Sequence, residues 1–378
     1  MSKERILIIN AIPLNNGDAA LVFSLYNKLK AKGHSIDIAT YHYKEVIKHY
    51  PQYPFVRELG QQKIFVKLPF LKFILLPFFF ILSQAHRKAT VIIGAPGGYI
   101  NSNYNIKSSL QVLKIAKLYG KKTAIYSQSI GPLNNKDARY FSNLMQNYID
   151  ILLVRDKYSK DTIDKLQISK DNIILSKDAA FFIKPKKLLN NQSKKVAFSV
   201  REWQYDKRDR IHYINLVKAL VDKICEYGYK VTFLSTCQGI DTYKNDALLA
   251  QEIVKSLKNK SGVSIDRESY TIDTFINKLN EFEFVIGTRL HMCILAMTQN
   301  IPAFNISYEI KGIQTYKYLN MPEYSIDYNA PIEKSLGQLN LFIKNTPQIN
   351  LYLQKEIPKI HQEINLDFER FYQEIFLK

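Results

Sequence analysis

Short apolar runs alternate with amphipathic segments along the first half of the chain. The apolar runs cover residues 5–10, 35–40, 90–93, 122–127 and 151–154. Segments with the helical spacing of apolar residues lie between them, at 19–32, 107–119 and 138–148. Strands that are apolar throughout are typical of a parallel sheet with both faces buried. The alternation therefore predicts an α/β domain whose sheet is covered by helices on both sides.

The second half repeats this pattern after a polar, basic stretch at Lys184–Lys195, which we interpret as a linker. Strands are predicted at 195–200, 230–235, 284–286 and 303–306, and helices at 211–226, 245–257, 270–279 and 290–299. We therefore expect two tandem Rossmann-like domains, residues 1–185 and 194–350, with a cleft between them. Residues 351–378 are predicted to form a helical tail that packs back across the linker.

Four loops at predicted strand ends of the first domain carry small or polar residues. They are Asn15-Asn16-Gly17-Asp18-Ala19, Ala95-Pro96-Gly97-Gly98-Tyr99, Ser127-Gln128-Ser129-Ile130-Gly131-Pro132 and Val154-Arg155-Asp156-Lys157-Tyr158-Ser159. Taken singly, each loop is as well explained by turn chemistry. The chain has neither G-x-G-x-x-G nor a P-loop, which disfavours a dinucleotide or Walker-type nucleotide site.

The second domain contributes Gly287-Thr288-Arg289-Leu290-His291, where a predicted strand ends and a helix begins. A second turn, Tyr308-Glu309-Ile310-Lys311-Gly312, adds a lysine after the next strand. Helix N-termini favour anions, and a guanidinium beside an imidazole suits a phosphate or carboxylate that must also exchange a proton. A capped helix with solvated charges is the alternative for an isolated Arg-x-His. Surface or loop positions are expected for the other six histidines: His34, His42, His49, His86, His212 and His361.

The net charge of +19 should attract anionic membranes, nucleic acid or anionic substrates. Part of it is compositional bias, because lysines outnumber arginines 42 to 11. No nucleic-acid motif accompanies the charge. Cys225, Cys237 and Cys293 show neither disulfide nor metal spacing and are predicted to be ordinary buried thiols. A strand begins within a few residues of Met1, so no signal peptide is expected and a cytoplasmic protein is predicted.

Residues 64–82 are unusually apolar, yet prolines and lysines interrupt them and they are too short to span a bilayer. A buried helix or a dimer surface is one interpretation. The other is an interfacial segment that lies on the inner face of the cell membrane, with nearby basic residues toward anionic headgroups. The sequence does not determine the oligomeric state.

Taken in order, the loops resemble the polysaccharide pyruvyl transferase family over roughly residues 5 to 325. The resemblance also includes an Asp-x-Ala-Phe-like element at Asp178 and Ser-Val-Arg from Ser199. Ala179 replaces a proline that is common in the former element, and the usual Asp-Pro before Lys311 is absent. The resemblance implies a GT-B-like fold and a transferase that moves the enolpyruvyl unit of phosphoenolpyruvate onto two hydroxyls of a sugar. Such a reaction gives a cyclic pyruvate ketal on a polysaccharide precursor carried by a lipid.

Under this interpretation, His291 and Arg289 are the catalytic residues. The donor would be bound by Arg155, Thr288, Arg289 and Lys311. The acceptor would be bound by Asn16, Gly17, Asp18, Gly97, Gly98 and Gln128. No cofactor or metal is expected. A glycosyltransferase that uses a nucleotide sugar is the main alternative, and a non-enzymatic basic protein that binds membranes or nucleic acid is the second.

Overall fold

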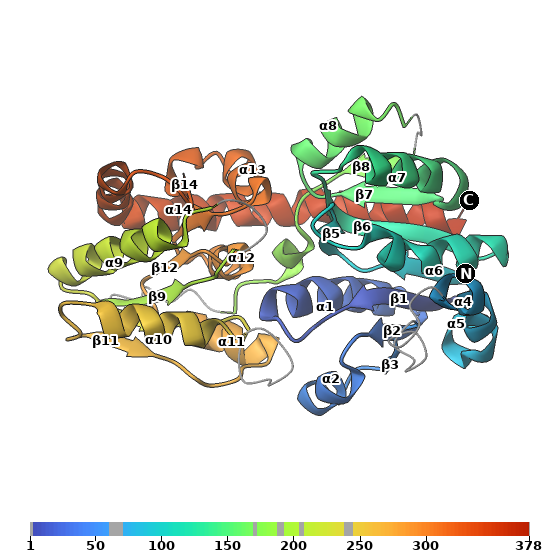
Figure 1. The fold of residues 1–378 in the computed structure, drawn as a ribbon, viewed down its shortest axis with the longest axis horizontal. Helices are drawn as coiled ribbons and strands as arrows, with labels where there is room; N and C mark the ends of the chain where they lie inside the picture. Colours follow the sequence, from blue (N-terminus) through green and yellow to red (C-terminus); the bar gives the residue numbers. More distant parts are fainter. Residues whose placement is uncertain are drawn as a thin grey trace. The chain divides into compact units, whose positions relative to one another are not determined.

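The computed structural model describes residues 3–59, 71–168, 172–186, 193–203, 208–237 and 245–377. The chain divides into two compact units, each built on one parallel sheet (Figure 1). Unit 1 comprises Met1–Leu14, Asp18–Ala179 and Glu363–Lys378, and unit 2 comprises Asn15–Gly17 and Ala180–Gln362.

The sheet of unit 1 has the strand order β3-β2-β1-β4-β6-β7-β8, and β5 pairs with β6. Its strands are β1 (Arg5–Ala11), β2 (Ser35–Thr40), β3 (Phe55–Arg57), β4 (Val91–Gly94), β5 (Gly97–Ile100), β6 (Lys122–Ile130), β7 (Ile151–Val154) and β8 (Ile173–Leu175). Its helices are α1 (Asn16–Ala31), α2 (Tyr43–His49), α4 (Leu71–Leu82), α5 (Gln84–Lys88), α6 (Ile106–Leu118), α7 (Asn135–Tyr148) and α8 (Lys157–Lys165). The strand order reverses direction between β1 and β4.

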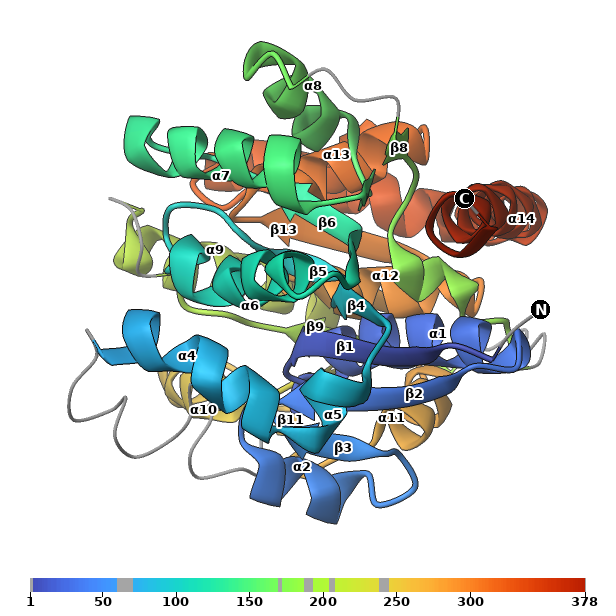
Figure 2. The same cartoon turned by 90° about the vertical axis from the view of Figure 1, so that its right-hand side faces the viewer.

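Alternate residues of the central strands serve two different cores in unit 1. Ile125 belongs to the cluster formed with α4, α6 and α7, whereas the neighbouring Tyr126 packs edge-on against Phe371 near the end of the last helix. This period of two is what a strand buried on both faces requires. Figure 2 shows α4, α6 and α7 on one side of this sheet and α1 on the other.

The sheet of unit 2 has the order β11-β10-β9-β12-β13-β14, and all its pairs are parallel. Its strands are β9 (Lys195–Ser199), β10 (Lys230–Phe233), β11 (Val263–Ile265), β12 (Phe284–Gly287), β13 (Ala303–Ser307) and β14 (Ser325–Asp327). Its helices are α9 (Arg210–Glu226), α10 (Asp246–Ser256), α11 (Ile272–Leu279), α12 (Leu290–Thr298), α13 (Ile310–Tyr318) and α14 (Ile332–Tyr372). This is the doubly wound Rossmann order, which reverses between β9 and β12.

Helix α14 belongs to both units. Its residues up to Gln362 group with unit 2, where Phe342 packs against Phe284 and Phe304. From Glu363 onward it groups with unit 1, where Glu369 forms an ion pair with Lys32. The predicted helix at 351–377 is therefore the second half of a 41-residue helix that also contains Pro347 and Pro358.

One loop prediction was wrong. The Gly97-Gly98 segment is strand β5 rather than a loop. Within the apolar segment 64–82, residues 71–82 form helix α4 despite Pro77, and residues 64–70 lie outside the described part. Burial of Leu76 and Phe80, worth roughly 1.5–3 kcal/mol each, offsets the cost of about 3 kcal/mol for a proline inside a helix.

Two histidines that were expected at the surface are buried. The ring of His34 lies between the backbone N–H of Glu4 and the hydroxyl of Tyr372. His86 is completely buried, and its Nδ1 lies 2.8 Å from the Ser83 hydroxyl. Burial lowers the pKa of His86 to about 4. The thiols of Cys237 and Cys293 are buried as expected, while Cys225 is half-buried.

Candidate active site

The Gly-Thr-Arg-Leu-His segment lies where the strand order of unit 2 reverses. Gly287 ends β12 and pairs in register with Ser199, the last residue of β9. The residues that follow, Thr288 and Arg289, therefore lie beyond the carboxyl ends of these two strands. Ligands of doubly wound sheets bind at this position.

The turn after β12 is held in place by hydrogen bonds to β9 and α9. The backbone N–H of Thr288 donates to the carbonyl of Ser199 at 3.0 Å, and that of Arg289 lies 3.2 Å from the Ser199 hydroxyl. The Thr288 hydroxyl is fully buried and lies 2.6 Å from that of Tyr213. Gly287 has no space for a side chain, because a Cβ atom there would lie 2.6 Å from the Cys293 sulfur. This turn is rigid, and the Thr288 side chain is part of its support.

Arg289 forms a buried bidentate ion pair with Asp246, the first residue of α10. Its Nε and Nη2 atoms lie 2.7 and 2.6 Å from the two carboxylate oxygens, and both residues are less than a tenth exposed. Burial by itself would lower the pKa of Arg289, but the charge and hydrogen bonds of Asp246 hold it above its usual value. The pair fixes the plane of the guanidinium, which has five N–H donors in all.

His291 lies in the first turn of α12, and Gly17 packs directly against its ring. A Cβ atom on Gly17 would lie 2.5 Å from the His291 Cβ and 2.6 Å from its Nδ1. The Asn15–Gly17 segment groups with unit 2, and the backbone N–H of Asn16 donates to the carbonyl of Thr236 at 3.0 Å. The Asn15–Ala19 loop and the Gly-Thr-Arg-Leu-His motif are therefore in contact.

Lys311 lies in the first turn of α13, the helix that follows the strand next to β12. Its ammonium is 2.6 Å from the Glu309 carboxylate and 5.8 Å from the centre of the Tyr308 ring. The guanidinium group of Arg201 lies over the same Tyr308 ring, with its central carbon 4.7 Å from the ring centre. This carbon is also 5.3 Å from the centre of the Trp203 ring. The N-termini of α12 and α13 open at the same edge of the sheet, because β12 and β13 are parallel neighbours.

Arg155 and Asp178 form the corresponding buried ion pair in unit 1. The Arg155 Nη1 atom is 2.6 Å from the Asp178 carboxylate, and both side chains are 3% exposed. The Arg155 Nε donates to the Ser129 hydroxyl, which in turn donates to Asp156, the residue that caps α8. Three sequence motifs, at Ser127, Val154 and Asp178, thus meet in one buried network.

The predicted acceptor residues lie in three places: after β1 (Asn16, Gly17 and Asp18), in β5 (Gly97 and Gly98) and in β6 (Gln128). Asp18 lies in the first turn of α1, and among the described residues no hydrogen bond or ion pair is made by its carboxylate. Gln128 is buried and donates to the carbonyl of Ala95, and the Gly98 carbonyl accepts from Asn101. Gly97 pairs in register with Gln128. The interactions described for four of these residues fix the course of the backbone: Asn16, Gly97, Gly98 and Gln128. Asp18 differs, because its carboxylate could contact an acceptor directly.

Glu58 is a buried carboxylic acid that sequence reasoning did not single out. It accepts hydrogen bonds from the backbone N–H groups of Asn10, at 2.7 Å, and Leu59, at 3.1 Å. Burial raises its pKa to about 7, although the two N–H groups and Lys72 of α4 act in the opposite direction. Glu58 follows β3 at the carboxyl edge of the unit 1 sheet.

Sequence reasoning also left Asp246, Tyr213 and Arg201 without a role at the site. Asp246 and Tyr213 lie within long helical patterns, where nothing local marks them as partners of the loop 43 or more positions further on. Arg201 was visible as part of the Ser-Val-Arg element. Its place at a strand end was the signal that could have identified it.

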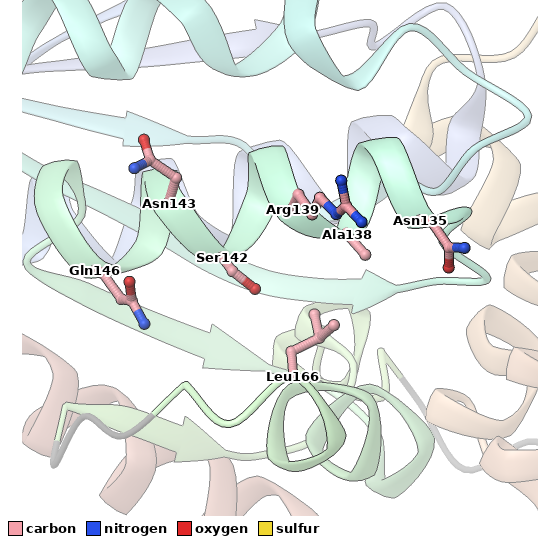
Figure 3. Close-up of a pocket in the computed structure, with 7 residues that line it drawn as sticks. All are labelled: Asn135, Ala138, Arg139, Ser142, Asn143, Gln146 and Leu166. Atoms are coloured by element: carbon pink, nitrogen blue, oxygen red, sulfur yellow. The ribbon is translucent and has the colours of Figure 1, made fainter.

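A pocket of about 530 Å³ lies along the flank of α7 and the end of α8 (Figure 3). Arg139 is the charged residue in its lining, with amide and hydroxyl side chains around it. In the described part of the chain, no three His, Cys, Asp or Glu residues gather as a metal site would require. The same part contains no helix long and apolar enough to cross a membrane.

Solved structures with similar folds support the assignment of a GT-B-like fold with two Rossmann-like domains. A glycosyltransferase from Rickettsia africae matches all of this chain and is itself fully covered, with a TM-score of 0.66 and 10% identity. HepE from Anabaena, solved with UDP-glucose, has a TM-score of 0.62 and 10% identity over 98% of both chains. At this level of identity, these likenesses concern the fold alone.

Two sequence comparisons address the family. The amylovoran biosynthesis protein AmsJ of Erwinia amylovora is 26% identical over 260 residues, which span 64% of this chain and 63% of that protein. The model of the family described as polysaccharide pyruvyl transferase matches residues 15–310. That range runs from the loop that contacts His291 to the first residue of α13. The chain is therefore an enzyme of the polysaccharide pyruvyl transferase family.

Proposed function

We propose that this enzyme transfers the enolpyruvyl unit of phosphoenolpyruvate to two hydroxyls of one sugar and leaves a cyclic pyruvate ketal. The observation that carries the proposal is the contact between Gly17 and His291. It brings a titratable imidazole at a helix N-terminus against the loop that begins the family match. The name of AmsJ supports an acceptor in polysaccharide biosynthesis.

The donor carries a phosphate and a carboxylate, and its binding would combine charges with helix N-termini. Arg289, Lys311 and Arg155 each lie beside a carboxylate. Their charges are therefore partly balanced, and they cannot act as bare cations. The N–H groups at the starts of α12 and α13, together with the remaining donors of Arg289, supply directed hydrogen bonds for an anion. Thr288 would act through the shape of the turn.

In the proposed reaction, His291 gives a proton to the methylene carbon of the donor. The adjacent carbon becomes an oxocarbenium-like centre, which one sugar hydroxyl attacks as it loses its proton. Inorganic phosphate then leaves, and the second hydroxyl attacks the same carbon. One of the two hydroxyl protons restores the proton that His291 gave to the methyl group, and the departing phosphate takes the other. Asp18 is the proposed acceptor of a hydroxyl proton, since its carboxylate is at a helix start beside Gly17.

The chemistry requires neither a metal nor a redox cofactor, and we propose that none takes part. The acceptor in our proposal is a sugar of a polysaccharide precursor carried on a lipid, so that the enzyme works at the inner face of a membrane. Nucleic acid has no part in this function.

Titration with phosphoenolpyruvate and, separately, with sugar nucleotides tests the donor. We expect phosphoenolpyruvate to raise the melting temperature in a dose-dependent way, because only the folded site binds it. UDP-glucose, which occupies the structurally similar HepE, should leave the melting temperature unchanged. Stabilisation by the sugar nucleotide alone would show that the chain is a glycosyltransferase and that the proposed donor is wrong.

A further inference from the structure

We infer that helix α4 and its neighbours form a surface that docks on an anionic lipid bilayer. Helix α4 has two unlike faces. Leu76 and Phe80 are at most 1% exposed and pack into the core of unit 1. On the opposite face, Ile74 is 68% exposed and Phe78 is 58% exposed. Ile81 and Leu82 continue this face, since residues spaced by three and four share one side of a helix.

The end of α6 packs against α4 and adds two exposed residues. The ring of Tyr119 stacks on that of Phe80 with centroids 5.4 Å apart, and Leu118 beside it is 67% exposed. Figure 2 shows α4 alongside α6. We call this surface the α4 patch; it consists of Ile74, Phe78, Ile81, Leu82, Leu118 and Tyr119. Exposed apolar side chains gathered on neighbouring elements mark an interaction site.

Basic residues border the α4 patch. Arg87 and Lys88 are exposed on α5, which follows α4 after a single residue. The ammonium of Lys121 donates to the carbonyl of Arg87 at 2.8 Å, which brings a third cation to the same edge. Apolar residues flanked by lysine and arginine are the pattern of helices that lie in the interface of a membrane.

The sequence around the patch contains no acid. Between Glu58 and Asp137 there are eleven lysines and arginines and no aspartate or glutamate. This stretch contributes 11 of the 19 net positive charges, and it includes all of α4, α5 and α6. Each lysine or arginine near an anionic leaflet strengthens attachment to it. The excess of positive charge is thus concentrated in the stretch of sequence that carries the exposed apolar residues, although Lys117 within it pairs with Asp150.

Exposed apolar residues bordered by cations fit an anionic lipid surface better than a second copy of this chain or a nucleic acid. A second copy docked on the same patch would bring two sets of exposed cations, Arg87 and Lys88, together, which electrostatic repulsion disfavours. Nucleic acid would use the charges but would leave the aliphatic residues uncovered. The purpose of the surface rests on the proposed function, because a lipid-linked acceptor is reached only at a membrane. The evidence for the surface is independent of the donor and acceptor.

Vesicle flotation without donor or acceptor tests this inference. The parent protein should float with vesicles of phosphatidylcholine mixed with phosphatidylglycerol, and should float poorly with phosphatidylcholine alone. Phe78→Ser combined with Leu82→Ser should reduce binding about tenfold or more. Phe80 is left intact because it is core. The matched control is Ile211→Ser with Leu248→Ser, which removes two equally exposed apolar side chains from unit 2 and should leave flotation unchanged.

Substitutions of the basic residues measure the electrostatic contribution to vesicle binding separately from the apolar one. Arg87→Gln with Lys88→Gln should weaken binding to the anionic vesicles and reduce its dependence on salt. The control is Lys258→Gln with Lys260→Gln, at exposed positions of unit 2, and it should change neither. Melting curves verify that each variant is folded.

Two results would overturn the inference. One is absence of flotation by the folded parent. The other is a parent dimer in light scattering that Phe78→Ser and Leu82→Ser convert to a monomer, because the patch would then be an interface between copies. Neither result bears on donor binding, which the phosphoenolpyruvate titration measures separately.

Discussion

Gly17 and His291 are 274 positions apart in sequence and yet so close that a methyl group on Gly17 would overlap the imidazole. The glycine is set in the first turn of a helix, where its backbone flexibility has no evident use. Its value is therefore the space it leaves. The position of the His291 ring depends on that space.

Gly17→Ala should displace the His291 ring or the start of α1. We expect kcat to fall by about tenfold to a hundredfold, because small misplacement of a catalytic group is costly. Gly337→Ala is the matched control: nothing lies within 4 Å of its added Cβ, and the position is an exposed site in α14. The control should stabilise the protein by about 0.5–1 kcal/mol and leave kcat unchanged. Equal activities of the two variants would mean that the contact has no catalytic importance.

His291→Ala should abolish transfer and spare donor binding. Loss of a positioned acid typically lowers the rate by about 10²–10⁴-fold. Phosphate release at saturating phosphoenolpyruvate gives kcat, and calorimetry gives donor affinity. His212→Ala is a control within unit 2, since His212 binds the carbonyl of Ala330. Near-normal turnover of His291→Ala would rule out proton transfer by this residue.

Asp246→Asn should destabilise unit 2 and weaken donor binding. Removal of one partner of a buried ion pair costs about 3–5 kcal/mol, because the remaining charge is left buried without compensation. Urea unfolding measures this loss. Glu252→Gln, six residues along the same helix, breaks an exposed pair with Arg210 and should unfold at the parent's midpoint. If both variants unfold together, the Arg289–Asp246 pair contributes no more than a surface pair.

Stability should fall as the pH rises from about 4.5 to 7 because of Glu58. Its folded pKa, about 7, lies above the ordinary value of 4.5, so the folded state holds a proton that the unfolded state releases. The contribution is fully present below pH 4.5 and is lost by pH 7, a change of about 3 kcal/mol. The difference between the parent and Glu58→Gln, measured by urea unfolding at several pH values, isolates it.

His86 should have the opposite effect in nearly the same range. Its folded pKa of about 4 lies below the ordinary 6.5, so the unfolded state binds the proton first as the pH falls. Stability from this residue is present above pH 6.5 and is lost as the pH falls to about 4. His86→Gln removes this opposing effect. The free energy of unfolding of the variant should therefore fall more steeply than the parent's as the pH rises from about 4.5 to 7. A profile that neither substitution alters would contradict both assignments.

The sequence predicted regular structure well where apolar periodicity was undisturbed. The ranges of β2 and β7 agree with the predicted ones residue for residue. The helical tail was predicted from residue 351, whereas α14 already begins at Ile332 and contains Pro347. Local rules count the hydrogen bond that a proline removes but not the packing that offsets it.

The candidate site was predictable only as separate positions. His291 and Arg289 could be placed at a strand end, because a glycine turn between a strand and a helix has a local signature. The pairing of Arg289 with Asp246, and of Arg155 with Asp178, depends on tertiary structure that spacing does not encode. Whether these arginines bind the donor stays a prediction, which a measurement of donor affinity in Asp246→Asn would test.

The last residues of α14 complete the wall of unit 1, where Phe371 packs on Tyr126 and Tyr372 binds His34. During translation, strands β1 to β8 leave the ribosome long before Glu363 is made. The complete native packing around Tyr126 in unit 1 therefore requires residues that are synthesised after those of unit 2.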